Sequence, residues 1–228
     1  MNMNYQKYNG TYILENNELY LDGYNRYIIE LLTRKSREFT QNEKILDFGA
    51  GIGTLAKIFS EAYGIKPFLI EIDPEQIKKL KKEGFSVYQK IQEYPHSFDF
   101  IYTSNVLEHI QDDKKILSEI YSKMKPNGLL AIYVPAFPIL FTDLDTAVGH
   151  FRRYTKNELE DKVKSAGLEV IYSHYADSIG FAVLLTVKIL AKKRILRFNN
   201  KASVKTRLVY PVTDTFPAVQ KASSFLFN

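Results

Sequence analysis

A short segment, from Asp47 to Gly53, combines a carboxylate with three closely spaced glycines. It reads DFGAGIG, with Gly49 and Gly51 at alternate positions before the last glycine. Glycine lets a backbone turn tightly and approach a ligand, because it has no Cβ. Glu71 stands twenty residues after Gly51, a spacing at which a carboxylate accepts ribose hydroxyls in nucleotide-binding folds. These residues predict a site for an adenosine-containing ligand.

The spacing of the glycines separates two classes of ligand. A dinucleotide site has the pattern G-x-G-x-x-G, but Thr54 stands where its third glycine would be and the glycine is Gly53. Asp47 beside the turn would repel a diphosphate, whereas it suits an ammonium group. S-adenosylmethionine has an ammonium group, a sulfonium and a ribose, so we favour it as the cofactor. An NAD-type oxidoreductase is the alternative.

Two histidines stand where a base could act on a bound molecule. His150, in GHFRRY, follows the fifth predicted strand and is our first candidate for a general base. His109, in LEHI after the fourth predicted strand, is the second. The alternative for each is an imidazole that only hydrogen-bonds a loop.

Three residues near the end of GHFRRYT form a candidate acceptor-binding segment. Arg152 and Arg153 carry guanidinium groups, whose forked shape matches a carboxylate or a phosphate, and Tyr154 follows them. The alternative for the arginines is an ion pair with Glu158 or Asp161 on the next predicted helix.

Two further groups of residues are weaker candidates. Tyr24 could cover the cofactor's sulfonium with its ring, although an aromatic residue at helical spacing belongs more often to the core. Asp143, Asp145 and His150 could bind a metal ion, but such ligand pairs are common by chance on polar loops. We therefore predict no metal site.

The elements that must position these residues alternate between strand and helix. Regular alternation of this kind indicates an α/β fold, a doubly wound and mostly parallel sheet with helices on both faces. The capping sequence TKNE opens the last of these helices at Thr155. Strands are predicted at 44–48, 66–72, 85–89, 98–104, 129–134 and 168–176, and helices at 24–32 behind an Asp22 cap, 55–64, 74–84, 112–125 and 155–167.

We expect one domain over residues 1–228, in three parts. Residues 1–42 form an N-terminal helical cover, residues 43–176 the cofactor-binding core, and residues 177–228 a basic helical addition. The sequence LEVIYSHYA has no convincing partner strand after it. Either SSFLFN at 223–228 pairs with it or the chain lacks that edge strand.

Charge and cysteine content exclude several classes of protein. With no cysteine, the chain has no disulfide framework, thiolate zinc site or cysteine nucleophile, which is compatible with the cytoplasm. Residues 178–212 contain eight Lys and Arg residues and no acid, so this segment alone carries a charge of +8, whereas the net charge of the whole chain is +5. The rest of the chain is therefore mildly acidic, which makes a nucleic-acid partner unlikely.

The basic segment at 179–207 could contact a membrane. Its apolar run at 179–191 is too short to span a bilayer, but a helix with basic neighbours can lie in the membrane interface and bring the active site to a lipid-linked acceptor. The alternative is a helix packed on the domain or at a dimer contact. The oligomeric state is left open.

Several segments together resemble the class I S-adenosylmethionine-dependent methyltransferases. LDFGAGIGTLA, LIEIDPEQI, FDFIYTSNVLEHI and MKPNGLLAIYVPAF resemble motifs of that family, and YNRYI and VGHFRRYT resemble a bacterial subgroup of it. The resemblance covers about residues 20–180 and implies a Rossmann-like sheet. It implies that Asp47 and the backbone of Gly49, Ala50 and Gly51 hold the methionine part of the cofactor, Glu71 the ribose, Ile72 and Ile91 the adenine, and Asn105 the far side.

The reaction implied is methyl transfer to oxygen or nitrogen of a small or amphiphilic acceptor, with S-adenosylhomocysteine as the product. Displacement at a sulfonium has a neutral leaving group, so positioning supplies much of the catalysis. No tetrapeptide like N-P-P-Y follows the fourth strand, so the resemblance does not extend to the amino methyltransferases that act on adenine or glutamine. Carbon methylation of cytosine through a cysteine adduct is excluded because the chain has no cysteine. A noncatalytic module that only binds S-adenosylmethionine is the remaining alternative.

Overall fold

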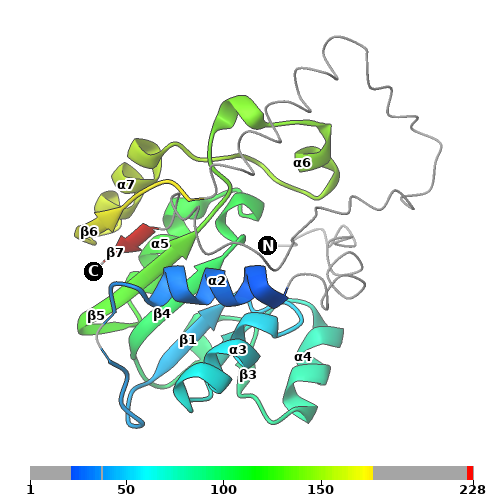
Figure 1. Ribbon diagram of the computed structural model, residues 1–228, viewed down its shortest axis with the longest axis vertical. Helices are drawn as coiled ribbons and strands as arrows, with labels where there is room; N and C mark the ends of the chain where they lie inside the picture. The colour runs from blue at the N-terminus through cyan, green and yellow to red at the C-terminus, as the bar shows by residue number, and fades with distance from the viewer. Residues whose placement is uncertain (1–21, 37, 177–224, 228) are drawn as a thin grey trace, which may run out of the picture.

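The computed structural model describes residues 22–36, 38–176 and 225–227. A seven-stranded sheet in the order β3-β2-β1-β4-β5-β7-β6 forms its centre (Figure 1). Strands β1 to β5 pair in parallel, and β7 pairs antiparallel with both β5 and β6. The strands are β1 Ile45–Phe48, β2 Phe68–Ile70, β3 Val87–Tyr88, β4 Phe98–Ser104, β5 Met124–Tyr133, β6 Val170–Ser173 and β7 Phe225–Phe227. The predicted α/β fold is confirmed.

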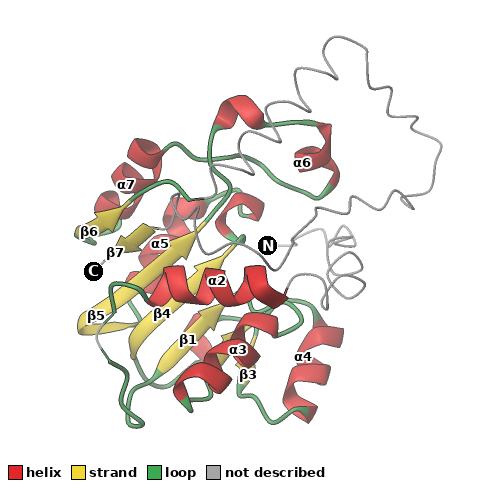
Figure 2. Ribbon diagram, in the orientation of Figure 1, coloured by secondary structure: helices red, strands yellow, loops and turns green. Residues whose placement is uncertain are grey.

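Helices cover both faces of the sheet (Figure 2). Side chains of α2 and α3 pack with Phe100 and Tyr102 of β4, whereas side chains of α5 and α7 pack on the other face with Ile101. The alternation along β4 is what a strand buried on both faces requires. The helices are α2 Asp22–Thr33, α3 Thr54–Tyr63, α4 Pro74–Lys82, α5 Asp113–Tyr121, α6 Asp143–Ala147 and α7 Lys156–Ser165, and the 3-10 turns are η2 Ile91–Glu93, η3 Leu107–His109 and η4 Pro138–Leu140.

The last strand comes from the far end of the chain. Of the two possibilities for the sheet edge, pairing by SSFLFN is the one observed, because β7 lies between β5 and β6. These three residues are therefore strand, within a segment predicted to be mainly helical. The rest of the predicted C-terminal addition, and the basic segment at 179–207, lie outside the described residues.

Local signals set where the helices begin and end. Asp73 caps α4 by accepting a hydrogen bond from the Glu75 amide at 2.8 Å, and Thr155 caps α7 in the same way through the Glu158 amide. Asp22 is the first residue of α2 and not its cap, and it pairs with Arg26 one turn later at 2.9 Å. β5 begins at Met124, five residues before the predicted strand and inside the helix predicted at 112–125, which ends at Tyr121 instead. α6 and the 3-10 turns were not predicted, and the other element boundaries lie within a few residues of those predicted.

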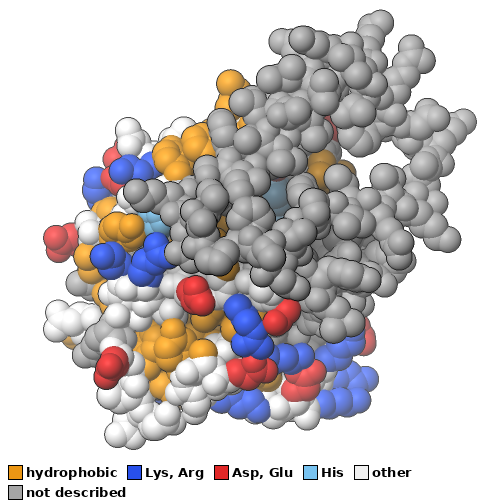
Figure 3. All heavy atoms as spheres, viewed as in Figure 1, with side chains coloured by type: hydrophobic (Ala, Val, Ile, Leu, Met, Phe, Trp, Pro, Cys, Tyr) orange, Lys and Arg blue, Asp and Glu red, His pale blue; other side chains and the backbone are white. Residues whose placement is uncertain are grey.

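The surface over α3 and α4 carries mixed charge. Figure 3 shows Lys and Arg side chains interspersed with Asp and Glu in this region. Among the described residues, no helix combines the length and the apolar character needed to cross a bilayer.

Candidate functional site

The turn after β1 is held by its backbone and requires glycine. The amides of Gly49 and Ala50 both donate to the Ile70 carbonyl at 2.9 Å, which joins the ends of β1 and β2. Gly49 has φ +86°, and a Cβ there would collide with the Val106 side chain. At Gly51, with φ +56°, a Cβ would meet no atom of the described residues within 4 Å. The turn is thus closed at its base and open at Gly51, where a ligand can approach the backbone.

Glu71 lies beside this turn and is fixed by three backbone amides. Its carboxylate accepts hydrogen bonds from Gly51 at 2.6 Å, Ile72 at 2.7 Å and Asp73 at 2.8 Å. Burial raises the pKa of Glu71, although these hydrogen bonds oppose the shift. The carboxylate is therefore held at the open turn. Among the residues that the structure describes, one of its oxygens accepts a hydrogen bond from Gly51 alone and has capacity for a ligand hydroxyl.

Asp47 is the least satisfied carboxylate near the turn. Its side chain is 2% exposed and, among the described residues, its Oδ2 atom has no hydrogen-bond partner. Burial raises its pKa to about 8, the nearby Tyr102 hydroxyl opposes the shift, and the Glu71 carboxylate adds to it. A buried polar atom without a partner is energetically unfavourable. An ammonium group would supply the missing donor and stabilise the ionised form, so the residues present fit S-adenosylmethionine.

Other residues predicted to hold the cofactor differ in accessibility. Ile72 follows β2 with 56% of its surface exposed, as a platform for an adenine ring requires. Asn105 follows β4, is exposed and has φ +53°, a conformation uncommon outside glycine. Ile91, in contrast, is 1% exposed and belongs to the core below the sheet. The predicted adenine contact from the Ile91 side chain is therefore wrong.

Tyr24 of α2 reaches the same end of the sheet. Its hydroxyl lies 2.9 Å from the hydroxyl of Tyr133, the last residue of β5. The ring also packs against the core cluster of α2 and α3. Tyr24 thus combines a core contact with a position beside the carboxyl ends of the strands, where ligands bind in open α/β sheets.

The loop after β5 holds His150 through a buried aspartate. His150 Nδ1 lies 2.9 Å from Oδ1 of Asp145, and Arg153 Nε donates to the same oxygen at 2.8 Å. The amide and hydroxyl of Thr142 bind the other oxygen, Oδ2, at 2.9 and 3.0 Å. Burial opposes ionisation of Asp145, but the hydrogen bonds from Arg153 and Thr142 prevail and hold its pKa below the usual range. Asp145 therefore orients the imidazole with Nε2 directed away from it.

The turn η3 brings a second imidazole and a buried acid to His150. The ring centroids of His109 and His150 are 4.6 Å apart, edge to face, and Nδ1 of His109 lies 3.3 Å from the Gly149 carbonyl. Burial, with a contribution from His150, lowers the pKa of His109 to about 4. The β5 loop is fastened here because the Phe151 amide donates to the Glu108 carbonyl at 2.8 Å.

Glu108 is a site residue that the sequence reading missed. Its side chain is fully buried, and neither carboxylate oxygen has a hydrogen-bond partner among the described residues. Burial raises its pKa to about 8. In the sequence LEHI, nothing distinguishes this buried glutamate from one on the surface. Its place between the end of a strand and a histidine was the one feature that could have indicated a role in the site.

The remaining predicted acceptor residues are engaged elsewhere. Tyr154 is 1% exposed and donates its hydroxyl to Asp113 at 2.8 Å, so its predicted contact with an acceptor is wrong. Arg152 also pairs with Asp113, at 2.6 Å, and Arg153 pairs with Asp145. Neither arginine contacts the Glu158 or Asp161 side chain that local sequence suggested; both reach acids on other elements.

Asp143, Asp145 and His150, considered from the sequence as metal ligands, do not form one group of ligands. Asp145 instead holds His150 and Arg153, and Asp143 is exposed.

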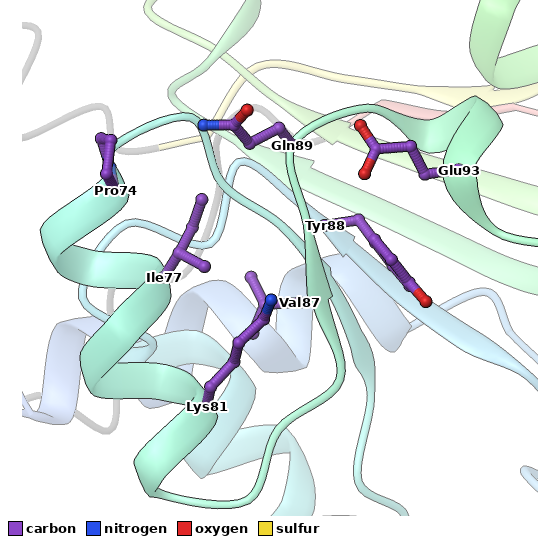
Figure 4. A pocket seen from close by; sticks show the side chains of 7 residues that line it. All are labelled: Pro74, Ile77, Lys81, Val87, Tyr88, Gln89 and Glu93. Atoms are coloured by element: carbon purple, nitrogen blue, oxygen red, sulfur yellow. The ribbon is translucent and has the colours of Figure 1, made fainter.

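A hollow of about 280 Å³ lies between α4 and β3, where Ile77, Val87 and Gln89 face one another (Figure 4). None of the predicted cofactor residues lines it.

Comparisons with known proteins identify the family to which the chain belongs. Residues 20–173, more than half of the chain, match a family model described as a methyltransferase domain. Phosphoethanolamine N-methyltransferase 2 of Caenorhabditis elegans is 23% identical over 151 residues, which are 60% of this chain and 35% of that protein. The chain thus matches about a third of that relative's length.

Solved structures share the fold. A chain from a structure titled "Complex between the Haloferax volcanii Trm112 methyltransferase activator and the putative methyltransferase" has a TM-score of 0.61 at 17% identity, over 74% of this chain and 78% of that one. Coclaurine N-methyltransferase bound to N-methylheliamine and S-adenosylhomocysteine has a TM-score of 0.54 at 16% identity, over 68% of this chain and 51% of that one.

Proposed function

We propose that the chain, which belongs to the methyltransferase domain family, is an S-adenosylmethionine-dependent enzyme that methylates oxygen or nitrogen of a small or amphiphilic acceptor. The observation that carries the proposal is the Asp145–His150 pair, 2.9 Å apart, at the ligand-binding end of the sheet. The family assignment displaces the NAD-type alternative.

The cofactor residues are proposed from the contacts described above. Asp47 Oδ2 receives the ammonium group, Glu71 a ribose hydroxyl, and the backbone at Gly51 lies against the methionine part. Ile72 offers its exposed side chain to the adenine, and Asn105 closes the far side. When bound, S-adenosylmethionine supplies an electrophilic methyl group on a positively charged sulfur.

His150 is the proposed base for acceptors that must lose a proton. With its Nδ1–H donated to Asp145, the Nε2 atom carries the lone pair that accepts a proton. The buried Asp145 keeps the ring in this tautomer and stabilises the imidazolium that forms. His109, with its low pKa, is neutral near physiological pH and is the weaker candidate.

The acceptor class is supported by apolar side chains around this loop. Ile139, Leu144 and Phe151 are each more than half exposed, on the segment between β5 and α7 that carries His150. Apolar residues exposed close together often mark a binding surface. An acceptor with an apolar part and a hydroxyl or amine would use both this surface and His150.

The experiment is a turnover assay on the full chain. S-adenosylhomocysteine is measured with a panel of small and amphiphilic amines and alcohols, for the wild type, His150→Gln and the control His96→Gln. We expect turnover with at least one acceptor, lost in His150→Gln and kept in His96→Gln, with cofactor binding intact in all three. Binding without turnover on any acceptor would instead support a noncatalytic module.

Peripheral membrane contact through residues 179–207 is a separate proposal, supported by the charge of that segment. It predicts that the protein sediments with anionic vesicles at low salt and is released at high salt. A lipid-linked acceptor requires this binding, and no sedimentation at low salt would remove it.

A further inference from the structure

Three potential metal ligands from two loops meet near the end of β4. Glu108 and His109 belong to η3, and His150 comes from the loop after β5. One ligand atom from each of these residues lies within 4.8 Å of the others. Separations of this size need only side-chain adjustment to close around one ion.

Each histidine of this cluster has a ring nitrogen within reach of an oxygen, as metal-binding histidines do. His150 Nδ1 is 2.9 Å from the Asp145 carboxylate, and His109 Nδ1 is 3.3 Å from the Gly149 carbonyl. Ligating histidines almost always donate one ring N–H to a carboxylate or a backbone carbonyl, which fixes the other nitrogen toward the metal. Both imidazoles have such a partner.

Glu108 is a second, independent indication. Its side chain is fully buried, and both oxygens lack hydrogen-bond partners among the described residues. Arg153, the cation whose field reaches Glu108, forms its ion pair with Asp145. A buried carboxylate in this situation is unfavourable unless a cation or a proton compensates it.

We propose that Glu108, His109 and His150 form a binding site for one divalent transition-metal ion of the zinc class. Two imidazoles and one carboxylate are ligands that Zn²⁺ accepts, and hard cations such as Mg²⁺ prefer all-oxygen sites. Three protein ligands leave a coordination position open, as in catalytic zinc sites. Because Arg153 already balances Asp145, the charge of an ionised Glu108 would be left for the metal ion to compensate.

The site's role in catalysis rests on the proposed function, whereas metal binding does not. At the open position the ion would take the oxygen of an acceptor hydroxyl and lower its pKa. The hydroxyl proton goes to solvent, the oxygen forms a bond to the methyl carbon, and the carbon–sulfur bond breaks to leave a neutral thioether. When the metal ion is bound, His150 is one of its ligands and does not itself take the proton from the acceptor.

The test measures metal binding directly, without cofactor or acceptor. The full-length protein is stripped with a chelator and titrated with Zn²⁺ by calorimetry and with Co²⁺ by its visible d–d absorption. The variants are Glu108→Gln, His109→Gln and His150→Gln, with His96→Gln as the matched histidine control outside the cluster. Circular dichroism and cofactor binding show that each variant is folded.

We expect one Zn²⁺ per chain in the wild type and in His96→Gln, and affinity at least about tenfold weaker in each ligand variant. Asp145→Asn, which removes the negative charge that His150 Nδ1 and Arg153 both contact, should weaken binding by about 10- to 100-fold. Equal binding in all variants, or no binding in the wild type, would overturn the metal site. Because cofactor binding is measured separately, such a result would leave the methyltransferase assignment intact.

Discussion

The buried carboxylates of the candidate site differ in the donors that reach them. Glu71 has backbone amides, Asp145 has Arg153 and His150, and Asp47 has an oxygen without a partner. The same residue type therefore serves as a fixed acceptor, an orienting group and a site for a ligand's charge. The differences follow from the number of donors within reach of each side chain.

The raised pKa of Asp47 predicts pH-dependent cofactor binding. Below its pKa of about 8 the side chain is protonated, and it must lose that proton to pair with an ammonium group. Affinity for S-adenosylmethionine should therefore fall as the pH is lowered from 8, with proton release on binding below it. Calorimetry in buffers of different ionisation enthalpy measures both. Asp47→Asn should bind weakly at every pH; wild-type affinity that rises on acidification would contradict this account.

Asp145 provides a second test at the residue scale. Replacing it with asparagine keeps its size but removes the charge that orients His150, so turnover should fall by about tenfold or more with little change in cofactor affinity. Steady-state rates over a range of pH report the change. An unchanged rate and pH profile would show that His150 needs no orientation by Asp145.

In the turn between β1 and α3, we expect one glycine to be needed for stability and another for cofactor binding. Gly49 is packed against Val106, whereas Gly51 faces open space. Gly49→Ala should lower the free energy of unfolding by about 1–3 kcal/mol or more, because it adds a collision to an unfavourable φ. Gly51→Ala should be milder in stability but weaken S-adenosylmethionine binding. Thermal denaturation and calorimetry compare the pair, and equal losses of stability would contradict the distinction.

Asp113 joins the loop after β5 to α5 and α7. Its Oδ2 atom accepts from Tyr154 at 2.8 Å and from Arg152 and Lys162 at 2.6 Å each. Asp113→Ala leaves two cations and a hydroxyl without their acceptor, and it should destabilise the fold by about 3–5 kcal/mol. Chemical denaturation measures this loss. Tyr154→Phe, which removes one donor, should lose about 1 kcal/mol and leave the acceptor KM unchanged; a raised KM would restore a role for Tyr154 in acceptor binding.

At the scale of the whole molecule, features set by local sequence were predictable and long-range partners were not. Alternating strands and helices indicated the sheet because each element's burial pattern is local. The pairing of Phe225–Phe227 with β5 and β6 could be named only as one of two possibilities, since nothing in three apolar residues identifies a strand so far away in sequence. The arginines were matched to acids on the next helix, but their partner acids lie on other elements.

The same limit applied within the site. The places of Asp47, Glu71 and His150 in or after their strands could be predicted, because motif spacing and strand ends locate them. Glu108 could not, because the residue type gives no sign that a glutamate is buried. Ile91 was misplaced because the short turn η2 directs its side chain to the core.

The central claim is that the carboxylate-flanked turn after β1 binds S-adenosylmethionine through Asp47. Calorimetry of the full chain with S-adenosylmethionine and with NAD, for the wild type and Asp47→Asn, tests it most directly. The account predicts one S-adenosylmethionine bound per wild-type chain, at least about tenfold weaker binding in Asp47→Asn because a charge-assisted hydrogen bond is lost, and no binding of NAD. Binding of NAD, or equal affinity of the two proteins for S-adenosylmethionine, would contradict it.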